Sequence, residues 1–323
     1  MEHVAGPPPV LEQLAQAFVE AHECPGVPGR TEPAPRDGEL AALHGEADRA
    51  PDVEEEWLAL PGCDGDRIRV RILRPADSDD LLPVVLYLHG LGWTHTTATT
   101  HQRLLEDLVL GSDAAVVVPE YDRPPTARYP VAVEQSYTVA RWIAENGAEW
   151  RLDGCRIAVV GVSAGANLAA ALTLVAKERG GVDFVHQVLV CPVTDAAGQT
   201  ASYRRFAEGY FLGSAAMRSF WQSYVPDAAR RREITASPLL ATTDDLRGLP
   251  PALVLTAEAD VVRDEGEAYA AKLRAAGVSV VSVRYHGTIH GFILFDMLRE
   301  SDAGRAARMQ TVDILHVALH RGW

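Results

Sequence analysis

The sequence has few of the features that mark several large classes of protein. Lysine occurs only twice, at Lys177 and Lys272, and 44 acidic residues outweigh 30 basic ones, for a formal net charge of −14. Because nucleic acids and anionic membranes are bound through basic surfaces that displace counterions, this charge argues against both as partners. The chain also lacks an apolar run of about 18 residues, which a membrane span needs. The N-terminus lacks the basic segment and continuous apolar core of a secretory signal. We therefore expect a cytoplasmic protein.

Cysteine is scarce as well. The four cysteines are Cys24, Cys63, Cys155 and Cys191. They are too few and too scattered for a disulfide framework, and none forms a CxxC pair of the kind that binds zinc. Cys155 and Cys191 flank apolar strands, so both are expected to be buried thiols.

The sequence is rich in short apolar runs bounded by turn residues, which alternate with longer segments of helical periodicity. The runs expected to form strands are 67–74, 83–89, 114–119, 156–161, 186–192, 251–257 and 278–285. Most of them lack polar alternation, which indicates strands buried on both faces of a parallel sheet. In the first run, arginines alternate with apolar residues, so this strand is expected at an edge or facing solvent.

Helices are expected between these strands. Their ranges are 101–110, 130–146, 164–179, 264–276 and 302–320. An alternation of strand and helix predicts a doubly wound α/β fold. Two segments fall outside the alternation, residues 1–50 with one amphipathic helix and the polar, aromatic-containing residues 195–238. They could pack together as a lid, or they could be a surface tail and an ordinary long insertion.

A candidate nucleophile lies where a buried strand runs into an alanine-rich helix. Gly161 to Gly165 form the pattern G-x-S-x-G around Ser163. A sharp strand-to-helix turn tolerates little side-chain bulk and lifts the serine hydroxyl clear of the sheet at a helix N-terminus. This position makes the motif more specific than the five residues alone. We therefore predict that Ser163 is a nucleophile.

A serine hydroxyl needs an imidazole to take its proton and an acid to orient that imidazole. The candidate acids follow the strand at 251–257 and are Glu258, Asp260, Asp264 and Glu265. Asp260 lies on the loop, whereas Asp264 and Glu265 fall in the first turn of the next helix, where acidic residues often simply favour the dipole. Of the two histidines that follow the last strand, His290 is the predicted base and His286 a surface or structural residue.

The four stretches "HGLGW" (89–93), "GVSAGAN" (161–167), "ADVVRDEG" (259–266) and "HGF" (290–292) resemble, in order and spacing, the hormone-sensitive-lipase family of α/β-hydrolases. Bacterial members of that family are carboxylesterases. The resemblance, over about residues 65–320, implies a mostly parallel eight-stranded sheet flanked by helices. It implies N-terminal cap helices in residues 1–50, and a catalytic domain in 51–323 with a cap insertion at about 195–238.

The same resemblance assigns residues to roles. It implies a triad of Ser163, Asp260 and His290. It also implies that backbone N–H groups stabilise the oxyanion of the transition state. The donors are Gly90, Leu91 and Ala164, supported by His89 and Gly92. Where the family's loop reads HGGG, this chain has a leucine, so Leu91 must keep φ below zero or tolerate mild strain.

Some residues depart from the family pattern, among them Val162, where Asp or Thr is usual, and Ala166, where Gly is usual. None of these changes removes a catalytic group. The expected reaction is hydrolysis of a small-molecule ester of small or medium acyl chain through an acyl-enzyme. An acyltransferase or eliminase with the same site remains an alternative, as does a non-catalytic binding protein on a hydrolase shell. No cofactor is expected, and a homodimer is left open. His95 and His101 lack a third ligand nearby, so no metal is predicted either.

Overall fold

A computed structural model describes residues 7–22, 50–62, 67–94 and 101–323. Their centre is one eight-stranded sheet with the order β1-β2-β4-β3-β5-β6-β7-β8. The strands are β1 (Val53–Pro61), β2 (Arg67–Pro75), β3 (Leu82–Leu88), β4 (Ala115–Glu120), β5 (Leu152–Val162), β6 (Phe184–Val190), β7 (Ala252–Ala259) and β8 (Val280–Ile289). β2 pairs antiparallel with β1 and β4, and the other pairs are parallel. The expected eight-stranded, mostly parallel sheet is confirmed.

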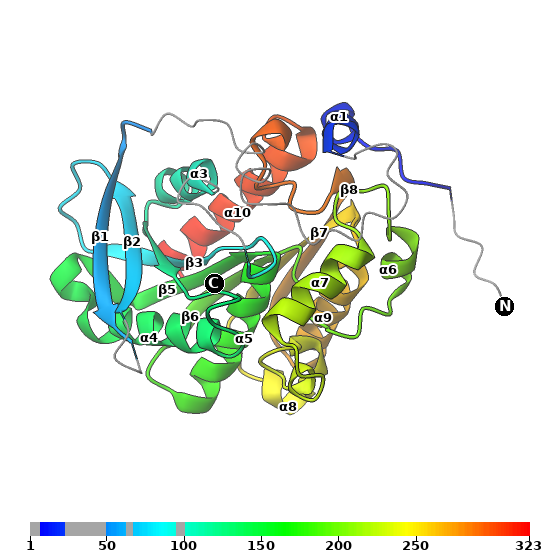
Figure 1. The fold of residues 1–323 in the computed structure, drawn as a ribbon. Coiled ribbons are helices and arrows are strands. Elements are labelled where there is room, and N and C mark those ends of the chain that lie inside the picture. The colour runs from blue at the N-terminus through cyan, green and yellow to red at the C-terminus, as the bar shows by residue number, and fades with distance from the viewer. Residues whose placement is uncertain (1–6, 23–49, 63–66, 95–100) are drawn as a thin grey trace.

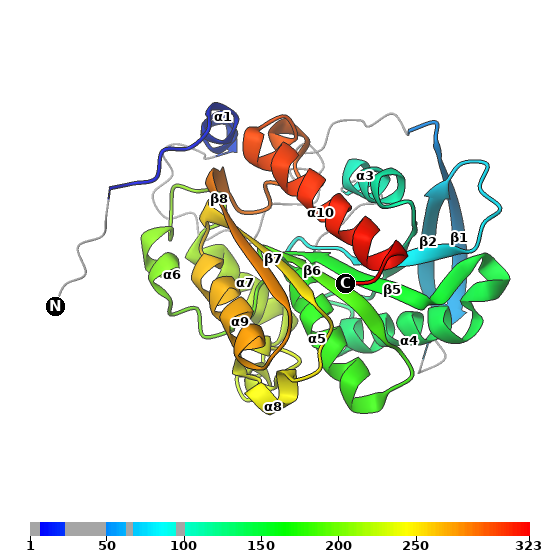
Figure 2. The ribbon, with the colours of Figure 1, turned by 180° about the vertical axis from the view of Figure 1, so that it is seen from behind.

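Helices cover both faces of the sheet. Their bounds are α1 (Gln13–His22), α3 (Gln102–Ser112), α4 (Val131–Asn146), α5 (Ala164–Arg179), α6 (Ala201–Arg205), α7 (Ser214–Tyr224), α8 (Thr243–Leu246), α9 (Arg263–Ala275) and α10 (Asp302–His320). Figures 1 and 2 show α3 and α10 on one face and α4, α5 and α9 on the other. This double cover explains why all seven residues of β3 are buried and why the parallel strands are apolar on both faces.

The edge of the sheet differs in part from the sequence prediction. The run at 67–74 was expected at an edge or facing solvent. β2 lies inside the sheet, between β1 and β4, while its Arg67 and Arg69 do face solvent. β1 was missed because three consecutive glutamates hide its alternation. Those charges explain the arginines of β2: Arg71 is buried and pairs with Glu55 at 2.7 Å, and Arg69 lies 4.4 Å over the ring of Trp57. Cross-strand charge pairing thus replaces contact with water at Arg71, whereas Arg69 keeps that contact.

The two segments outside the alternation lie near each other. α1 is tied to α10 through Glu12, the residue before α1, whose carboxylate accepts hydrogen bonds from the backbone N–H groups of Asp302 and Ala303. Phe18 of α1 is fully buried, with its ring centroid 5.1 Å from that of Phe211 in the 195–238 segment. Contact between the two segments is therefore established, whereas their action as a cap stays a prediction.

Two further expectations concern the surface. Cys191 is buried as predicted, but Cys155 is exposed, because it lies in the outer part of β5, before the strand enters the core. Cys24, Cys63 and His95 fall outside the described residues.

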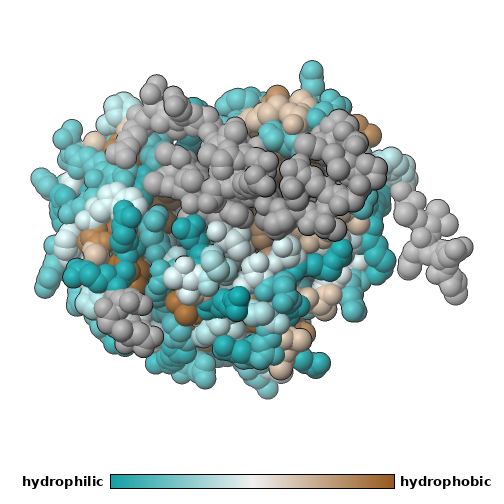
Figure 3. Space-filling model, viewed as in Figure 1, coloured by the Kyte–Doolittle hydropathy of each residue, from teal (hydrophilic) through white to brown (hydrophobic). Residues whose placement is uncertain are grey.

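On the face in Figure 3, hydrophilic residues predominate among the coloured atoms, and hydrophobic ones occur in small groups, as is normal for a protein surface. No helix in the described part of the chain is long and apolar enough to cross a membrane.

Candidate active site

Ser163 lies at the turn between β5 and α5 with a strained backbone, φ 59° and ψ −120°. The two glycines around it are required by close packing. A methyl group at Gly161 would lie 2.2 Å from the carbonyl oxygen of Gly165, and one at Gly165 would lie 1.9 Å from that of Leu88. The turn is held to the sheet by the Ser163 N–H, which donates to Val190 at 2.8 Å. The G-x-S-x-G pattern therefore forms the sharp turn that the sequence predicts.

The structure brings Ser163, His290 and Asp260 together. Asp260 follows β7 and His290 follows β8, so adjacent parallel strands deliver both side chains to the same edge of the sheet. His290 Nε2 lies 2.8 Å from Ser163 Oγ, and His290 Nδ1 lies 2.8 Å from Asp260 Oδ2. The second carboxylate oxygen of Asp260 accepts a hydrogen bond from the Val262 N–H at 3.0 Å. The Asp260 side chain is fully buried, which keeps this chain of hydrogen bonds away from water.

The other candidate acids take part in other contacts. Glu258 lies 3.3 Å from His286, which is exposed, in agreement with the surface role predicted for this histidine. Asp264 accepts a hydrogen bond from a backbone N–H of α6. Glu265 is fully buried and accepts one from the Thr194 N–H at 2.8 Å, so it does more than favour the helix dipole. Asp260 is thus the candidate acid whose contact with His290 the structure records.

The loop after β3 has an unusual backbone. Leu91, Gly92 and Trp93 have φ values of 68°, 65° and 59°, three left-handed residues in succession. Leu91 was expected either to keep φ below zero or to tolerate mild strain. The first alternative is wrong, and the loop holds Leu91 in a strained backbone. Gly90 packs directly against the serine turn, because a methyl group there would lie 2.5 Å from the carbonyl oxygen of Val162. The candidate oxyanion donors thus lie beside Ser163.

Helix α7 supports this strained loop. The Trp93 ring stacks on Tyr224 with centroids 4.4 Å apart, and Trp221 lies against it at 4.8 Å. Gly92 leaves room for Phe220, since a methyl group there would lie 2.3 Å from its ring. Left-handed backbone costs a non-glycine residue about 1–2 kcal/mol, and burial of these aromatic rings offsets that cost.

His89 anchors the start of the loop. Its ring stacks on Tyr121 with centroids 4.0 Å apart, and the Tyr121 hydroxyl donates to the His89 carbonyl at 2.7 Å. Burial lowers the pKa of His89 to about 3, so the imidazole is neutral at physiological pH. These contacts suit the supporting role predicted for His89.

Comparison with known proteins identifies the family. Residues 85–294 match a family described as alpha/beta hydrolase fold. Carboxylesterase NlhH of Mycobacterium tuberculosis is 37% identical over 261 residues, which cover 79% of this chain and 80% of that protein. Ethyl acetate hydrolase of Pseudomonas putida is 34% identical over 268 residues, 82% and 83% of the two chains. The structure of a thermostable esterase from Pseudomonas putida ECU1011 superimposes with a TM-score of 0.92 at 44% identity, covering 98% of this chain and 99% of that one.

The chain belongs to the hormone-sensitive-lipase-like family of α/β-hydrolases. The resemblance seen in the sequence is thereby confirmed, and so is the enzyme class, a carboxylesterase.

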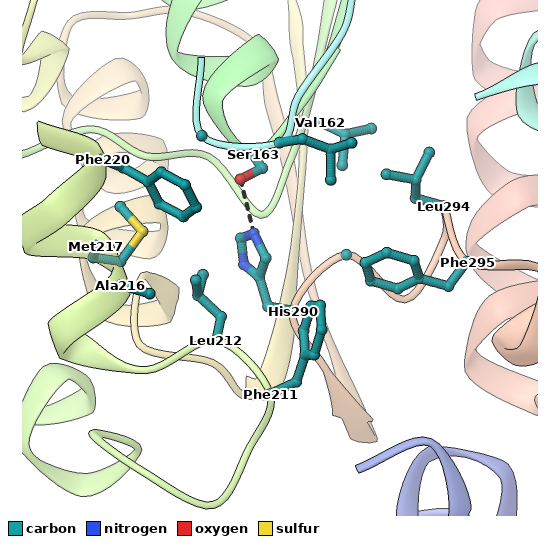
Figure 4. A pocket seen from close by; sticks show the side chains of 13 residues that line it. Val162, Ser163, Phe211, Leu212, Ala216, Met217, Phe220, His290, Leu294 and Phe295 are labelled. Carbon is teal, nitrogen blue, oxygen red and sulfur yellow. Dashed lines mark hydrogen bonds between the residues drawn. The ribbon is translucent and has the colours of Figure 1, made fainter. Parts of the chain in front are cut away.

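The pocket of this α/β-hydrolase opens onto Ser163 and His290. The other described residues that line it are Leu91, Gly92, Val162, Phe211, Leu212, Ala216, Met217, Phe220, Gly291, Leu294 and Phe295. Figure 4 shows Leu212, Met217 and Phe220 on one side of the His290 ring and Leu294 and Phe295 on the other. The aromatics of the 195–238 segment stand out in the sequence, but their place at a pocket was not predicted. Their spacing on α7, with Met217 and Phe220 three residues apart, was the available signal.

One group of described residues at the site has the atom types of a metal-binding site. Within the described residues, ligand atoms of Cys191, Asp260 and His290 lie within 4.8 Å of one another. Both ring nitrogens of His290 are already hydrogen-bonded, one to Asp260 and one to Ser163, an arrangement suited to proton transfer. His101 is buried and hydrogen-bonded to Tyr87 at 2.6 Å.

Proposed function

We propose that this esterase hydrolyses carboxylic esters of small or medium acyl chain through a covalent intermediate on Ser163. The observation that carries the proposal is the unbroken series of hydrogen bonds from Asp260 through His290 to Ser163. In the first step His290 takes the Ser163 proton as the oxygen attacks the ester carbonyl, then gives that proton to the leaving alkoxide. In the second step His290 takes a proton from water as the water attacks the acyl-enzyme, and returns that proton to the Ser163 oxygen as the acid leaves.

Backbone N–H groups of Gly90, Leu91 and Ala164 are the proposed oxyanion donors. A donor of this kind must be fixed in place before the reaction, because reorganisation in the transition state would cost rate. The packing of Gly90 on the serine turn and the burial of Trp93 by α7 support such a fixed loop. Asp260 orients the His290 ring throughout.

The preference for small or medium acyl chains rests on two observations. The pocket beside Ser163 is lined by apolar side chains, among them the rings of Phe211, Phe220 and Phe295. The Pseudomonas putida relative is an ethyl acetate hydrolase, 34% identical to this chain. An apolar pocket of limited width favours short, uncharged acyl groups.

Turnover of p-nitrophenyl acetate together with fluorophosphonate labelling tests the proposal against the alternatives. A hydrolase labels on Ser163 and turns over rapidly in water. An acyltransferase labels but hydrolyses slowly until an alcohol or amine acceptor is added. A non-catalytic binding protein does neither. Slow hydrolysis that a nucleophilic acceptor accelerates more than tenfold would replace our proposal with acyl transfer.

The Leu91 side chain should limit the size of the substrate, because it lines the pocket beside Ser163. We expect Leu91→Gly to keep kcat/KM on ethyl acetate within about tenfold and to improve tert-butyl acetate relative to it by about tenfold or more, since a mismatched apolar group costs about 1–3 kcal/mol. Relief of the positive φ should hold the change in unfolding free energy below about 1 kcal/mol.

Leu91→Ala separates volume from backbone freedom in that experiment. If side-chain volume sets the selectivity, the alanine variant follows the glycine variant in the tert-butyl to ethyl ratio. A ratio unchanged in both variants would show that Leu91 does not restrict the substrate.

We also propose that α1 and the 195–238 segment act as a cap over the pocket. Phe18 supports this, because its ring lies 5.1 Å from Phe211 and 5.0 Å from Phe295, and both of these line the pocket. We expect Phe18→Ala to lower kcat/KM on p-nitrophenyl butyrate by about tenfold as the wall loosens, and to lower the melting temperature. Gln16→Ala, an exposed change on the same helix, is the control. Equal kcat/KM in both variants would make α1 a structural attachment only.

A further inference from the structure

Cys191 occupies a strained position beside the triad. It directly follows β6, is 1% exposed, and has a φ of 46°, in the region that residues other than glycine rarely adopt. Its backbone N–H donates to Leu255 of β7 at 2.7 Å, so the strained residue is fixed to the strand that leads to Asp260. Strain at a buried residue next to reacting groups points to a functional constraint.

The Cys191 sulfur contacts both loops that carry triad residues. Sγ lies within 4.8 Å of a carboxylate oxygen of Asp260 and a ring nitrogen of His290. The backbone of Ala257, in β7, and of Gly291, which follows His290, also lies beside the sulfur. Burial, and then the charge of Asp260, raise the pKa of Cys191 well above its ordinary value, so the group is a neutral thiol that can donate.

The segment that begins with Cys191 is held against α9. Glu265 accepts a hydrogen bond from the Thr194 N–H at 2.8 Å, and its carbonyl accepts one from the Thr194 hydroxyl at 2.9 Å. Gly266 allows α9 to approach Pro192, because a methyl group there would lie 3.1 Å from the proline ring. The same helix follows the Asp260 loop, so Cys191 and Asp260 are fixed to one rigid support.

We propose that Cys191 is a positioning residue, whose thiol donates a hydrogen bond to Asp260 and so holds the carboxylate against His290. A buried carboxylate has about four acceptor positions, and unfilled ones are costly. Asp260 has two filled by His290 and Val262. The thiol fills a third and joins the acid to the backbone that follows His290. This inference rests on the proposed triad and adds a residue that a triad motif does not include.

The surroundings leave the Asp260 carboxylate as the charge that the thiol faces. Glu265 and Tyr203 are buried nearby, and burial raises the pKa of each well above its ordinary value, which favours the neutral form of both. Asp195 is partly exposed and accepts a hydrogen bond from the Ala197 N–H at 2.9 Å. Loss of the thiol would therefore leave Asp260 with one hydrogen-bond donor fewer, and none of these groups is a charged donor that could replace it.

The test compares Cys191→Ala, which removes the donor, with Cys191→Ser, which keeps one. We expect the alanine variant to lose about three- to tenfold in kcat with KM changed less than about twofold, because the acid is held less firmly while the pocket is intact. The serine variant should keep at least half of the wild-type kcat. Cys155→Ser, an exposed change on β5, is the control for loss of a thiol. Equal losses in the alanine and serine variants would assign Cys191 to packing alone.

The pH profile of kcat/KM distinguishes positioning from packing. Without the thiol, one hydrogen-bond donor no longer offsets the negative charge of Asp260. The carboxylate then stabilises the protonated form of His290 more strongly. The acid limb of the alanine variant should therefore move up by about half a pH unit, while that of the serine variant stays at or below the wild-type limb. Limbs that coincide in all variants would overturn the proposal. If alanine does not fold at a φ of 46°, Cys191→Gly removes the same donor without backbone strain.

Failure of this inference and failure of the triad give different results. The Cys191 variants keep Ser163, Asp260 and His290, so fluorophosphonate should label all of them. Absence of labelling in the wild-type protein would count against the triad itself, whereas normal labelling with unchanged kcat and pH profile in Cys191→Ala would count against Cys191 alone.

Discussion

Replacement of Ser163 by alanine is expected to lower kcat by about 10⁴- to 10⁶-fold. Without the hydroxyl no acyl-enzyme can form, and what remains is the activity of the oxyanion hole and substrate binding on attack by water. The fold should survive, because alanine is smaller than serine and the strained turn around it is held by packing of Gly161 and Gly165. Initial rates with p-nitrophenyl acetate and a thermal unfolding curve measure both expectations.

Fluorophosphonate labelling gives an independent readout for this variant. Wild-type protein should gain the mass of one phosphonyl group, and Ser163→Ala should gain none. Ser219→Ala, a half-exposed serine of α7 that does not line the pocket, is the matched control and should label and turn over normally. More than a tenth of wild-type activity in a clean Ser163→Ala preparation would show that another residue is the nucleophile.

The central sheet could be predicted from the sequence because its strands are buried. Parallel strands with helices on both faces need continuous apolar runs, and such runs stand out against polar turns. β1 could not be predicted in the same way, since Glu54, Glu55 and Glu56 occupy its first half. They are accommodated by arginines on the neighbouring strand, as in the pair of Glu55 with Arg71. A charge that is neutralised across a sheet cannot be distinguished, in sequence, from one that faces water.

The positive φ values in the loop after β3 could not be predicted from the sequence, for a related reason. A leucine and a tryptophan argue locally against positive φ, yet Leu91 and Trp93 both adopt it. The decisive contacts come from α7, more than 120 residues later in the chain, where Tyr224 and Trp221 bury the Trp93 ring. Tertiary packing overrides local preference here, and nothing near Leu91 in the sequence reports it.

Cys191 shows the same limit at the site itself. The three residues of the proposed triad could be predicted because each stands in a motif with a fixed relation to a strand end. Cys191 stands in "LVCPVTD", where the sequence indicates only a thiol after an apolar strand. Its contact with Asp260 depends on the pairing of β6 with β7, which puts the two strand ends side by side. Sheet order, not sequence separation, decides which residues surround a catalytic acid.

The prediction that distinguishes the acids is the comparison of Asp260→Asn with Asp264→Asn. We expect Asp260→Asn to lower kcat by about 10³- to 10⁴-fold, because a neutral amide neither stabilises the imidazolium nor holds His290 in the required tautomer. Asp264→Asn should change kcat less than about threefold. Its amide oxygen can still accept the hydrogen bond from α6, and loss of the contact with Arg263 should cost some stability.

The ranking of these two variants decides which residue is the acid of the triad. Each variant removes one negative charge, and the two positions are only four residues apart. The reverse ranking would move the acid by one helical turn, into α9. Equal and modest losses would mean that a neighbouring carboxylate substitutes, and Glu265 and Glu258 are the two to replace next. The structure makes this outcome unfavourable: Glu265 is committed to Thr194, and Glu258 accepts a hydrogen bond from the Gly287 N–H at 2.9 Å. Neither carboxylate can turn to His290 without leaving a buried or partly buried backbone N–H without its acceptor, at a cost of about 1–3 kcal/mol.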